Sequence, residues 1–542
     1  MKMKKTVASV FILAMFVLVS SAQAGICPGT NLIKDPPEFQ WVNSGGYQSG
    51  TLEIGEATLT IGTDTLTTRA YRQAGRAFSI PGPTIKMTPG ETYVLTFKNT
   101  LPYEEPSPVH NDLKDPNITN IHTHGLHVSG ETPGDDVTRL INGGYCGDYV
   151  YEVPGNHMGG TLWYHAHHHG STYLQVAGGA FGLLIVNDSG DGIPLNVAGM
   201  TERLLAIGYL DPSVAGAGGD TLVSGTLSPT WTVNGAVQGN LCMPAGEWQH
   251  WRVLLADRDA RMKTVSVEPT AACEVALLAR DRVWRTVAPK GLPINSVELT
   301  GASRADLAVK CSADATINVN GTPVANVVAD GTLTPNSLVG PYSNGATGGT
   351  WSANRPSYLR DLRGESAVEN RSINMGARTI NGEKFDAVVP TFSIPAGLVQ
   401  EWTIKGATNH PFHQHVYHVQ MSGACGDFEN GEYYDTVAAS PCDVRFDLNP
   451  ATSSVYDGRT IMHCHILQHE DEGAMGWSDV IGGFAPPLFP DPTVQQALYQ
   501  CGSTSPPPPS VDCSQFTTAK LCNAEPTCSW SGKNKVCEPI SS

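Results

Sequence analysis

The residues with the greatest capacity for chemistry are histidines and one cysteine, gathered in four short stretches. Fourteen of the 17 histidines lie in NIHTHGLHV, WYHAHHHGS, HPFHQHVYH and HCHILQHEDEGAMGW, and ten of them are candidate metal ligands. These ten are His122, His124, His165, His167, His410, His413, His415, His463, His465 and His469. Imidazole nitrogen and thiolate sulfur are preferred ligands of transition metals, so the pattern indicates metal chemistry.

Each of the four stretches contains a His-x-His pair. Alternate side chains on a β-strand point to the same face, so each pair can direct two imidazoles at one place, and four pairs suffice for a multinuclear metal centre. Cys464, between His463 and His465, points to the opposite face, so one strand serves two metal sites joined by a few bonds. That arrangement suits electron transfer. The candidate ligands outside the multinuclear set are Cys464, His410 and His469. They form the His2Cys donor set of blue-copper sites.

Two ordinary explanations compete with a multinuclear metal centre. A single His-x-His pair is most often a surface pair, and structural zinc sites use four ligands that are usually rich in cysteine. Ten histidines with one cysteine fit neither pattern. The other histidines lack a matched partner and are interpreted as surface residues or as neighbours of a metal site: His110, His127, His157, His168, His169, His250 and His418.

In their order and separation, His-x-His-Gly, Trp-Tyr-His-x-His, His-Pro-x-His-x-His and His-Cys-His-x3-His resemble the four signatures of multicopper oxidases. The resemblance implies a three-domain, laccase-like architecture of cupredoxin sandwiches and a cofactor of four coppers per chain. By motif position, the type 1 copper takes His410, Cys464 and His469, and the type 2 copper takes His122 and His413. One type 3 copper takes His124, His165 and His465, and the other takes His167, His415 and His463.

The same resemblance implies an activity. A reducing substrate would give single electrons to the type 1 copper, these would pass through Cys464 and its flanking histidines, and O2 would be reduced to two waters. Glu470 follows the last histidine, where the resemblance to bacterial laccase-like members implies a proton relay, although it could also be an exposed loop acid. Asp135 is the second relay candidate, and Asp136 competes with it for that position.

The axial position beside the type 1 copper is unusual. The family usually has Met, Leu or Phe five residues after the last histidine, whereas here that residue is Ala474. We expect the register to be kept, so that Ala474 faces the metal with a methyl group too short to coordinate it. A one-residue bulge at Gly473 and Gly476 would instead bring Met475 to the metal.

The predicted function is a copper-dependent oxidase with phenols or aromatic amines as donors. The alternative within enzymes is oxidation of Cu(I), Fe(II) or Mn(II), although the chain has only 12 methionines and no cluster of them, which disfavours Cu(I). A copper-binding protein without turnover would need neither an electron path nor proton acids. A copper nitrite reductase would need fewer histidines at its second copper.

The elements that position these residues are predicted to be strands. Helical periodicity is scarce, and short alternating or β-branched runs such as TYVLTFKNT and GLLIVND are separated by Gly, Pro and Asn turns. We therefore predict an all-β chain of three sandwich domains at 25–190, 195–345 and 365–490. The resemblance to multicopper oxidases implies that these are Greek-key, cupredoxin-like sandwiches. A proline-rich linker at 503–511 then leads to a Cys-rich module at 512–542, which is too small to fold on a core alone.

The ends and the charge suggest where the protein works. Residues 1–24 have the basic start, apolar run and Ala-Gln-Ala end of a signal peptide, which predicts a secreted or periplasmic protein without a membrane span. Besides Cys464, twelve of the 13 cysteines remain for disulfides, and proximity suggests Cys273–Cys311 and Cys425–Cys442. The net charge of −17 disfavours nucleic acid as a partner. The expected partners are O2 and a small reducing substrate, and the protein is a monomer or an oligomer of undetermined size.

Overall fold

The structure of the chain is a computed structural model. It describes residues 31–188, 193, 195–217, 220–286, 289–336, 340–341, 355–488, 498–501, 528–531 and 536–539. The predicted signal peptide, the proline-rich linker and most of the Cys-rich module lie outside these residues. Within the described part of the chain, no helix has the length and apolarity needed to cross a bilayer.

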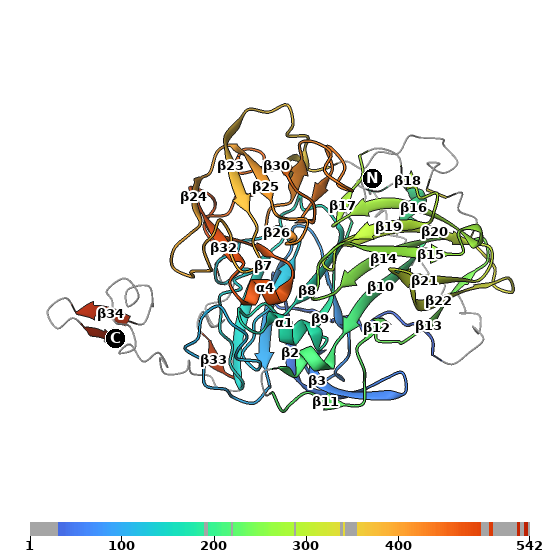
Figure 1. The fold of residues 1–542 in the computed structure, drawn as a ribbon, viewed down its shortest axis with the longest axis horizontal. Coiled ribbons are helices and arrows are strands. Elements are labelled where there is room, and N and C mark those ends of the chain that lie inside the picture. The colour runs from blue at the N-terminus through green and yellow to red at the C-terminus, as the bar shows by residue number, and fades with distance from the viewer. Residues whose placement is uncertain are drawn as a thin grey trace, which may run out of the picture.

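Strands dominate the structure and form three pairs of facing sheets, as the all-β prediction required (Figure 1). The larger sheet of the first domain contains β1 (Val42–Asn43), β2 (Gln48–Ile61), β3 (Asp64–Gln73), β5 (Thr92–Asn99), β7 (Tyr145–Glu152), β11 (Ser224–Gly225) and β33 (Tyr499–Gln500). Its smaller sheet contains β4 (Gly82–Met87), β6 (His122–His124), β8 (Gly160–His165) and β9 (Phe181–Val186).

The second domain follows the same plan. One sheet contains β10 (Thr201–Leu210), β12 (Thr230–Val233), β14 (Trp248–Ala256), β16 (Cys273–Arg280), β17 (Val283–Trp284), β18 (Lys290–Gly291) and β20 (Arg304–Cys311). The other contains β13 (Gly239–Pro244), β15 (Lys263–Glu268), β19 (Ser296–Leu299), β21 (Ala315–Val319) and β22 (Thr322–Asp330). A single apolar core lies between these two sheets.

The third domain has two five-stranded sheets. The first contains β23 (Ala367–Asn374), β25 (Val399–Lys405), β27 (Val419–Met421), β28 (Tyr433–Tyr434) and β30 (Cys442–Asp447). The second contains β24 (Phe392–Pro395), β26 (Phe412–Gln414), β29 (Thr436–Val437), β31 (Gly458–Cys464) and β32 (Met475–Ile481). Among the described residues the α-helices are short: α1 (Thr172–Ala177), α2 (Leu195–Ala198), α3 (Pro212–Ala215) and α4 (Leu467–Asp471). In the Cys-rich module, β34 (Cys528–Ser531) pairs with β35 (Val536–Pro539).

The first domain packs closely on the second because β9 is apolar on both faces. Leu184 and Val186 enter the core of the first sandwich. Phe181, Leu183 and Ile185 point the other way and pack with residues of β10 and β14. Side chains alternate along a strand, so an uninterrupted apolar run such as FGLLIV is expected where both faces are covered.

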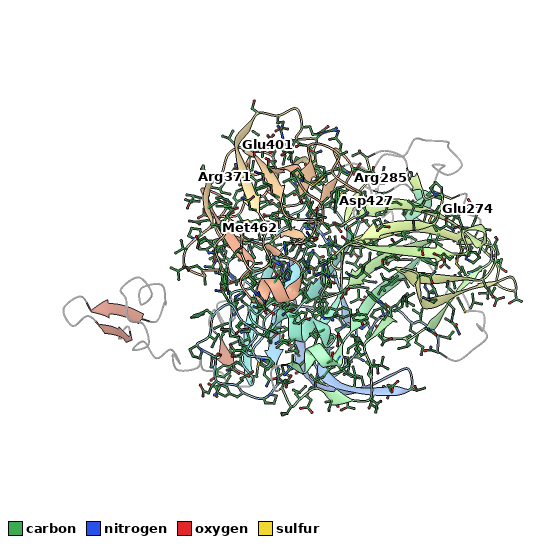
Figure 2. The ribbon with its side chains drawn as sticks, viewed as in Figure 1. Glu274, Arg285, Arg371, Glu401, Asp427 and Met462 are labelled. Carbon is green, nitrogen blue, oxygen red and sulfur yellow. A yellow bond between two sulfur atoms is a disulfide. The ribbon has the colours of Figure 1, made fainter. Side chains whose placement is uncertain are left out.

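Polar contacts join the third domain to both of the other domains. Figure 2 labels Arg285 and Asp427 where the second and third domains meet, and there Arg285 Nη1 donates to Glu429 Oε2 at 3.1 Å. On the other side, α4 lies against α1 of the first domain, and the Asp471 carboxylate accepts the backbone N–H groups of Gly170 and Tyr173 at 2.6 and 2.8 Å.

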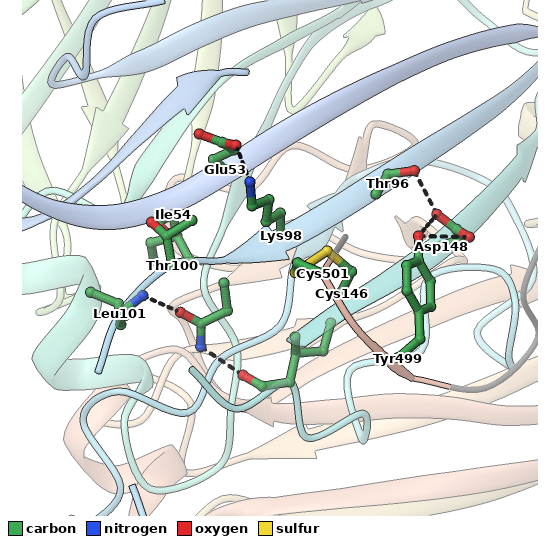
Figure 3. Close-up of a disulfide and its surroundings, with 12 residues drawn as sticks. Glu53, Ile54, Thr96, Lys98, Thr100, Leu101, Cys146, Asp148, Tyr499 and Cys501 are labelled. Atoms are coloured by element: carbon green, nitrogen blue, oxygen red, sulfur yellow. Dashed lines mark hydrogen bonds and ion pairs between the residues drawn. A yellow bond between two sulfur atoms is a disulfide. The ribbon is translucent and has the colours of Figure 1, made fainter. Parts of the chain in front are cut away.

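Three disulfides are described. Both predicted pairs, Cys273–Cys311 and Cys425–Cys442, are confirmed. The third joins Cys146 on β7 to Cys501, 355 residues later, and places β33 at the edge of the first domain's sheet (Figure 3). The segment after the third domain therefore returns to the first, which sequence proximity could not indicate. Cys464 is the free cysteine among the described residues, and it is buried.

Candidate metal centre

Strand register brings the histidine stretches together. β6 and β8 of the first domain are antiparallel, with His122 opposite His165. β26 and β31 of the third domain are also antiparallel, with His413 opposite His463. The stretches that are distant in sequence therefore meet at the junction of the first and third domains, and the side chains there are buried.

The imidazoles at this junction form three triads, two of which share His124. In each triad the nitrogens lie within 4.8 Å of one another. The triads are His122–His124–His413, His124–His165–His465 and His167–His415–His463. The two members of a His-x-His pair thus mostly serve different triads. The last two triads are the sets that motif position assigns to the type 3 coppers, and His122 and His413 of the remaining triad are the type 2 pair.

The hydrogen bonds of these rings have a consistent direction. The outer nitrogens of several rings donate to protein oxygens: His122 Nδ1 to Asp135 Oδ2 at 2.6 Å, His124 Nε2 to Asp435 Oδ1 at 3.1 Å, His165 Nδ1 to the Ala166 carbonyl at 2.9 Å, His413 Nδ1 to the Asp435 carbonyl at 2.8 Å and His463 Nδ1 to the Cys464 carbonyl at 3.0 Å. Such bonds fix the ring orientation and tautomer of metal-binding histidines.

The inner nitrogens are buried without a hydrogen-bond partner. They are His122 Nε2, His124 Nδ1, His165 Nε2, His413 Nε2, His415 Nε2 and both nitrogens of His465. Buried polar atoms are normally satisfied, so a group of converging orphan nitrogens fits metal ions at this place. Burial also lowers the pKa values of these rings, to about 4 for His124 and about 3 for His463. The neutral imidazole is the form that binds a metal.

A second donor set lies on the other face of β31. Cys464 is fully buried in the core of the third domain, and its Sγ lies 3.7 Å from His469 Nδ1. His410 Nδ1 lies 3.2 Å from the same nitrogen, and both rings are partly exposed. One thiol and two imidazoles at this spacing fit a blue-copper donor set whose imidazole edges a donor molecule can reach.

The loop after His469 keeps a regular path beside the thiol. Ala474 donates its N–H to the His469 carbonyl at 2.8 Å, and its own carbonyl accepts the Cys464 N–H at 2.9 Å. Its methyl group lies in the same core as Cys464. Met475 belongs to a separate cluster with Val137 and Ile461, on the other face of the sheet. Ala474 is therefore the residue that shares the face of the Cys464 thiol.

Both carboxyl groups that the sequence offered as main relay candidates are buried against the histidine triads. Glu470 is fully buried, with Oε1 3.8 Å from His167 Nδ1 and 3.7 Å from His169 Nδ1, so it is not an exposed loop acid. Burial raises its pKa well above the usual range. Asp135 bonds to His122, and burial raises its pKa to about 8. Asp136 bonds instead to the hydroxyls of Thr132 and Thr138.

Sequence reasoning missed a buried charge at this site. Asp435, between β28 and β29, contacts His124, His418 and Arg304 through its side chain. Burial alone would raise its pKa, but Arg304 and His124 hold the pKa of this carboxyl well below its usual range. Asp435 belongs to no His-rich stretch. The available signal was an arginine in the otherwise largely apolar strand RADLAVKC.

The remaining unmatched histidines are mostly not surface residues. His127, His157, His168, His250 and His418 are buried. Several of them bond to backbone carbonyls or carboxylates, such as His250 Nε2 to Asp306 Oδ1 at 2.8 Å. The surface interpretation is therefore wrong for these five. Most of these imidazoles are hydrogen-bonded inside the protein, as buried polar groups usually are, and they do not face solvent.

Comparisons with known proteins agree with this geometry. Residues 72–191 and 359–481, which contain all four His-rich stretches, both match families described as multicopper oxidase. The chain belongs to the multicopper oxidase family. Membership implies that copper binds at the histidine clusters, and the orphan nitrogens fit it.

Relatives match this multicopper oxidase over most of its length. The multicopper oxidase mco of Staphylococcus haemolyticus (strain JCSC1435) is 26% identical over 422 residues, which cover 73% of this chain and 81% of that protein. The laccase of Bacillus subtilis (strain 168) is 24% identical over 480 residues, covering 74% and 88%.

Solved structures show the same fold. The laccase of Pediococcus acidilactici superposes with a TM-score of 0.64 at 18% identity, over 84% of this chain and 94% of that one. A multicopper oxidase from Campylobacter jejuni described as a metallo-oxidase has a TM-score of 0.63 at 19% identity, over 84% and 96%. Both are similar in their cupredoxin-like domains.

Proposed function

We propose that this multicopper oxidase couples one-electron oxidation of a small organic donor to the four-electron reduction of O2 to water. Bound copper would supply one-electron redox chemistry at the Cys464 site and O2 reduction at the histidine triads. We assign about four coppers to each chain, with the ligands that motif position implies. The observation that carries the proposal is that two separate donor sets share one strand.

The covalent connection between the two sets is short. Cys464 lies on one face of β31, and its neighbours His463 and His465 belong to the two buried triads on the other. The His463 ring is also bonded to the Cys464 carbonyl at 3.0 Å. This geometry supports electron transfer between the sets, and it argues against a storage protein, which would need no such connection.

The protein also has groups that could deliver protons. Glu470 lies on the side of the cluster near His167, and Asp135 lies on the side of His122. We infer that these two carboxyl groups are proton relays, because a buried acid with a raised pKa can hold a proton near neutral pH and release it to a neighbouring acceptor.

The surroundings of the exposed imidazole edges favour an organic donor over a metal cation. Near His410, Asp259 pairs with Arg261, the two charged groups being 3.2 Å apart. The carboxylate that follows α4, Glu472, pairs with Arg378. Both arginines also lower the pKa of His469, after the larger effects of burial and His410. Paired carboxylates beside positive charge are a poor site for a divalent cation.

Oxidation of Cu(I), Fe(II) or Mn(II) remains the second candidate, because the fold also occurs in the Campylobacter jejuni protein described as a metallo-oxidase. The two are separated by measuring O2 uptake of the copper-loaded protein with a phenol, an aromatic amine and each metal ion. We expect larger kcat/KM for the organic donors. A metal ion that outperforms them by tenfold or more would reverse the assignment of the donor.

We further propose that the protein is exported. The signal-like segment at 1–24 supports this, and so do three disulfides among the described residues, since disulfides persist in oxidising compartments.

A further inference from the structure

The sequence of the second domain has no His-x-His motif, yet one of its side chains contacts Asp435, which bonds to a histidine of the triads. Arg304 is the first residue of β20 and is fully buried. Its Nη1 donates to Asp435 Oδ1 at 3.0 Å and its Nη2 to Asp435 Oδ2 at 2.5 Å. A two-pronged contact of this kind fixes the carboxylate in direction as well as in position.

Asp435 passes this constraint to histidines of two domains. Its Oδ1 accepts from His124 Nε2 of the first domain at 3.1 Å, which leaves His124 Nδ1 directed at the triads. Its backbone carbonyl accepts from His413 Nδ1 of the third domain at 2.8 Å, which leaves His413 Nε2 directed there. The His124 and His413 rings are stacked, with centroids 3.9 Å apart.

Arg304 itself is held on several sides. Its Nε donates to the Thr161 carbonyl of the first domain at 3.2 Å, and Nη1 also donates to the Ala302 carbonyl at 3.1 Å. Its backbone N–H donates to Asp281 Oδ1 at 3.0 Å. Two backbone carbonyls thus orient the guanidinium in addition to Asp435.

The glycine of the first His-x-His-Gly motif makes room for this contact. A Cβ on Gly125 would lie 2.7 Å from Arg304 Nη2 and 3.1 Å from Asp435 Oδ2. Gly125 also has a φ of +89°, which disfavours other residues. The backbone beside His124 therefore lies so close to the Arg304 guanidinium that only glycine fits there.

We propose that Arg304 is a positioning residue of the copper cluster, acting from the second domain through Asp435 on His124 and His413. The second domain then supplies one wall of the site rather than serving only as a spacer. The inference rests on the proposed assignment of copper to the triads, and it concerns how that copper is held, not which donor is oxidised.

A buried arginine that only stabilises the fold offers a matched control. Arg252 lies on β14, in the same sheet, and is also buried. It pairs with Asp306 and Asp188 at 3.2 and 2.8 Å, and neither carboxylate contacts a histidine of the triads. Arg304→Lys and Arg252→Lys keep the charge and remove the planar fork in both places.

The experiment compares copper binding by the parent, Arg304→Lys, Arg252→Lys and Asp435→Asn, each prepared metal-free and titrated with copper. Thermal unfolding of each metal-free protein measures the purely structural effect. Copper at the Cys464 site is followed by the blue absorption and the other coppers by metal analysis and electron paramagnetic resonance. Loss of a residue that orients metal ligands typically lowers metal affinity about 10–100-fold.

We expect Arg304→Lys and Asp435→Asn to weaken binding at the triads by about that factor while the blue site fills normally. We expect Arg252→Lys to lower the unfolding temperature but keep parental copper affinity. The proposal is overturned if Arg304→Lys and Asp435→Asn bind copper as the parent does, or if Arg252→Lys loses triad copper equally. Asp435→Asn preserves size and so tests the contact even if Arg304→Lys does not fold. A parent without copper at the triads would instead refute the proposed function.

Discussion

Cys464 and its two neighbours in the sequence belong to different donor sets. The thiol enters the core of the third domain, while His463 and His465 enter the triads on the opposite face of β31. We expect Cys464→Ser to abolish the blue colour and nearly all turnover, because a serine oxygen is a poor ligand for this copper. The unfolding temperature of the metal-free protein should change little. Parental turnover with a phenol would show that electrons do not enter through Cys464.

Ala474 should set the potential of the same site. Its methyl group shares the core with the Cys464 thiol, whereas Met475 packs with Val137 and Ile461. A site without an axial donor disfavours Cu(II) and has a high potential. Ala474→Met should therefore lower the potential in a redox titration of the blue band, and Met475→Leu should leave it nearly unchanged. A large rise in potential for Met475→Leu would make Met475 the axial ligand.

Glu470 is the residue where proton delivery can be tested. Glu470→Gln keeps the shape of the side chain but cannot titrate, so O2 reduction should slow while a phenol still reduces the blue site at the parental rate. Rapid mixing under anaerobic and aerobic conditions separates the two steps. Glu472→Gln, two residues later, is the control. Unchanged O2 reduction in Glu470→Gln would remove this carboxyl from the relay.

At the scale of elements, the turn after β6 carries a constraint that can be measured. Gly125→Ala would place a Cβ 2.7 Å from Arg304 Nη2 at a positive φ. We expect the metal-free protein to lose about 1–3 kcal/mol of unfolding free energy in urea. Gly423→Ala is the control, since a Cβ there meets no atom within 4 Å. Equal stability of the two variants would contradict the close approach of the guanidinium.

Elements also show what could be predicted from the sequence. The His-x-His spacing revealed which side chains share a face, because strand periodicity is local. The four stretches could therefore be grouped from the sequence alone. Arg304 could not be grouped with them, because its contact with Asp435 depends on how two domains pack and has no local pattern. The pairing of Cys146 with Cys501 was hidden for the same reason, since it is set by the path of the chain after the third domain.

Whole-molecule stability should depend strongly on pH when copper is absent. Many histidines have lowered pKa values through burial, among them His124 at about 4 and His127 and His463 at about 3. In the unfolded chain each of these histidines regains its ordinary pKa of about 6.5 and binds a proton below that pH. Acidification to pH 5 therefore favours unfolding by about 2 kcal/mol for each such histidine.

Buried carboxyl groups act in the opposite direction. Burial raises the pKa of Asp135 to about 8 and that of Asp281 to about 6. The folded protein therefore loses the stability contributed by these two groups as pH rises from about 4. The buried histidines outnumber them. We therefore expect the unfolding temperature of the metal-free protein to fall clearly between pH 7 and pH 5. A constant or rising temperature over that range would contradict the neutral, buried state of the triads.

The central claim is that the two donor sets act together to reduce O2 completely. The most direct test is the stoichiometry of O2 uptake by the copper-loaded protein with a one-electron phenolic donor in excess. The account predicts one O2 consumed for about every four donor molecules oxidised, without accumulation of hydrogen peroxide, because electrons arriving singly at the Cys464 site are collected at the triads. A ratio of about one to two with hydrogen peroxide as the product, or oxidation of the donor without O2 uptake, would contradict it.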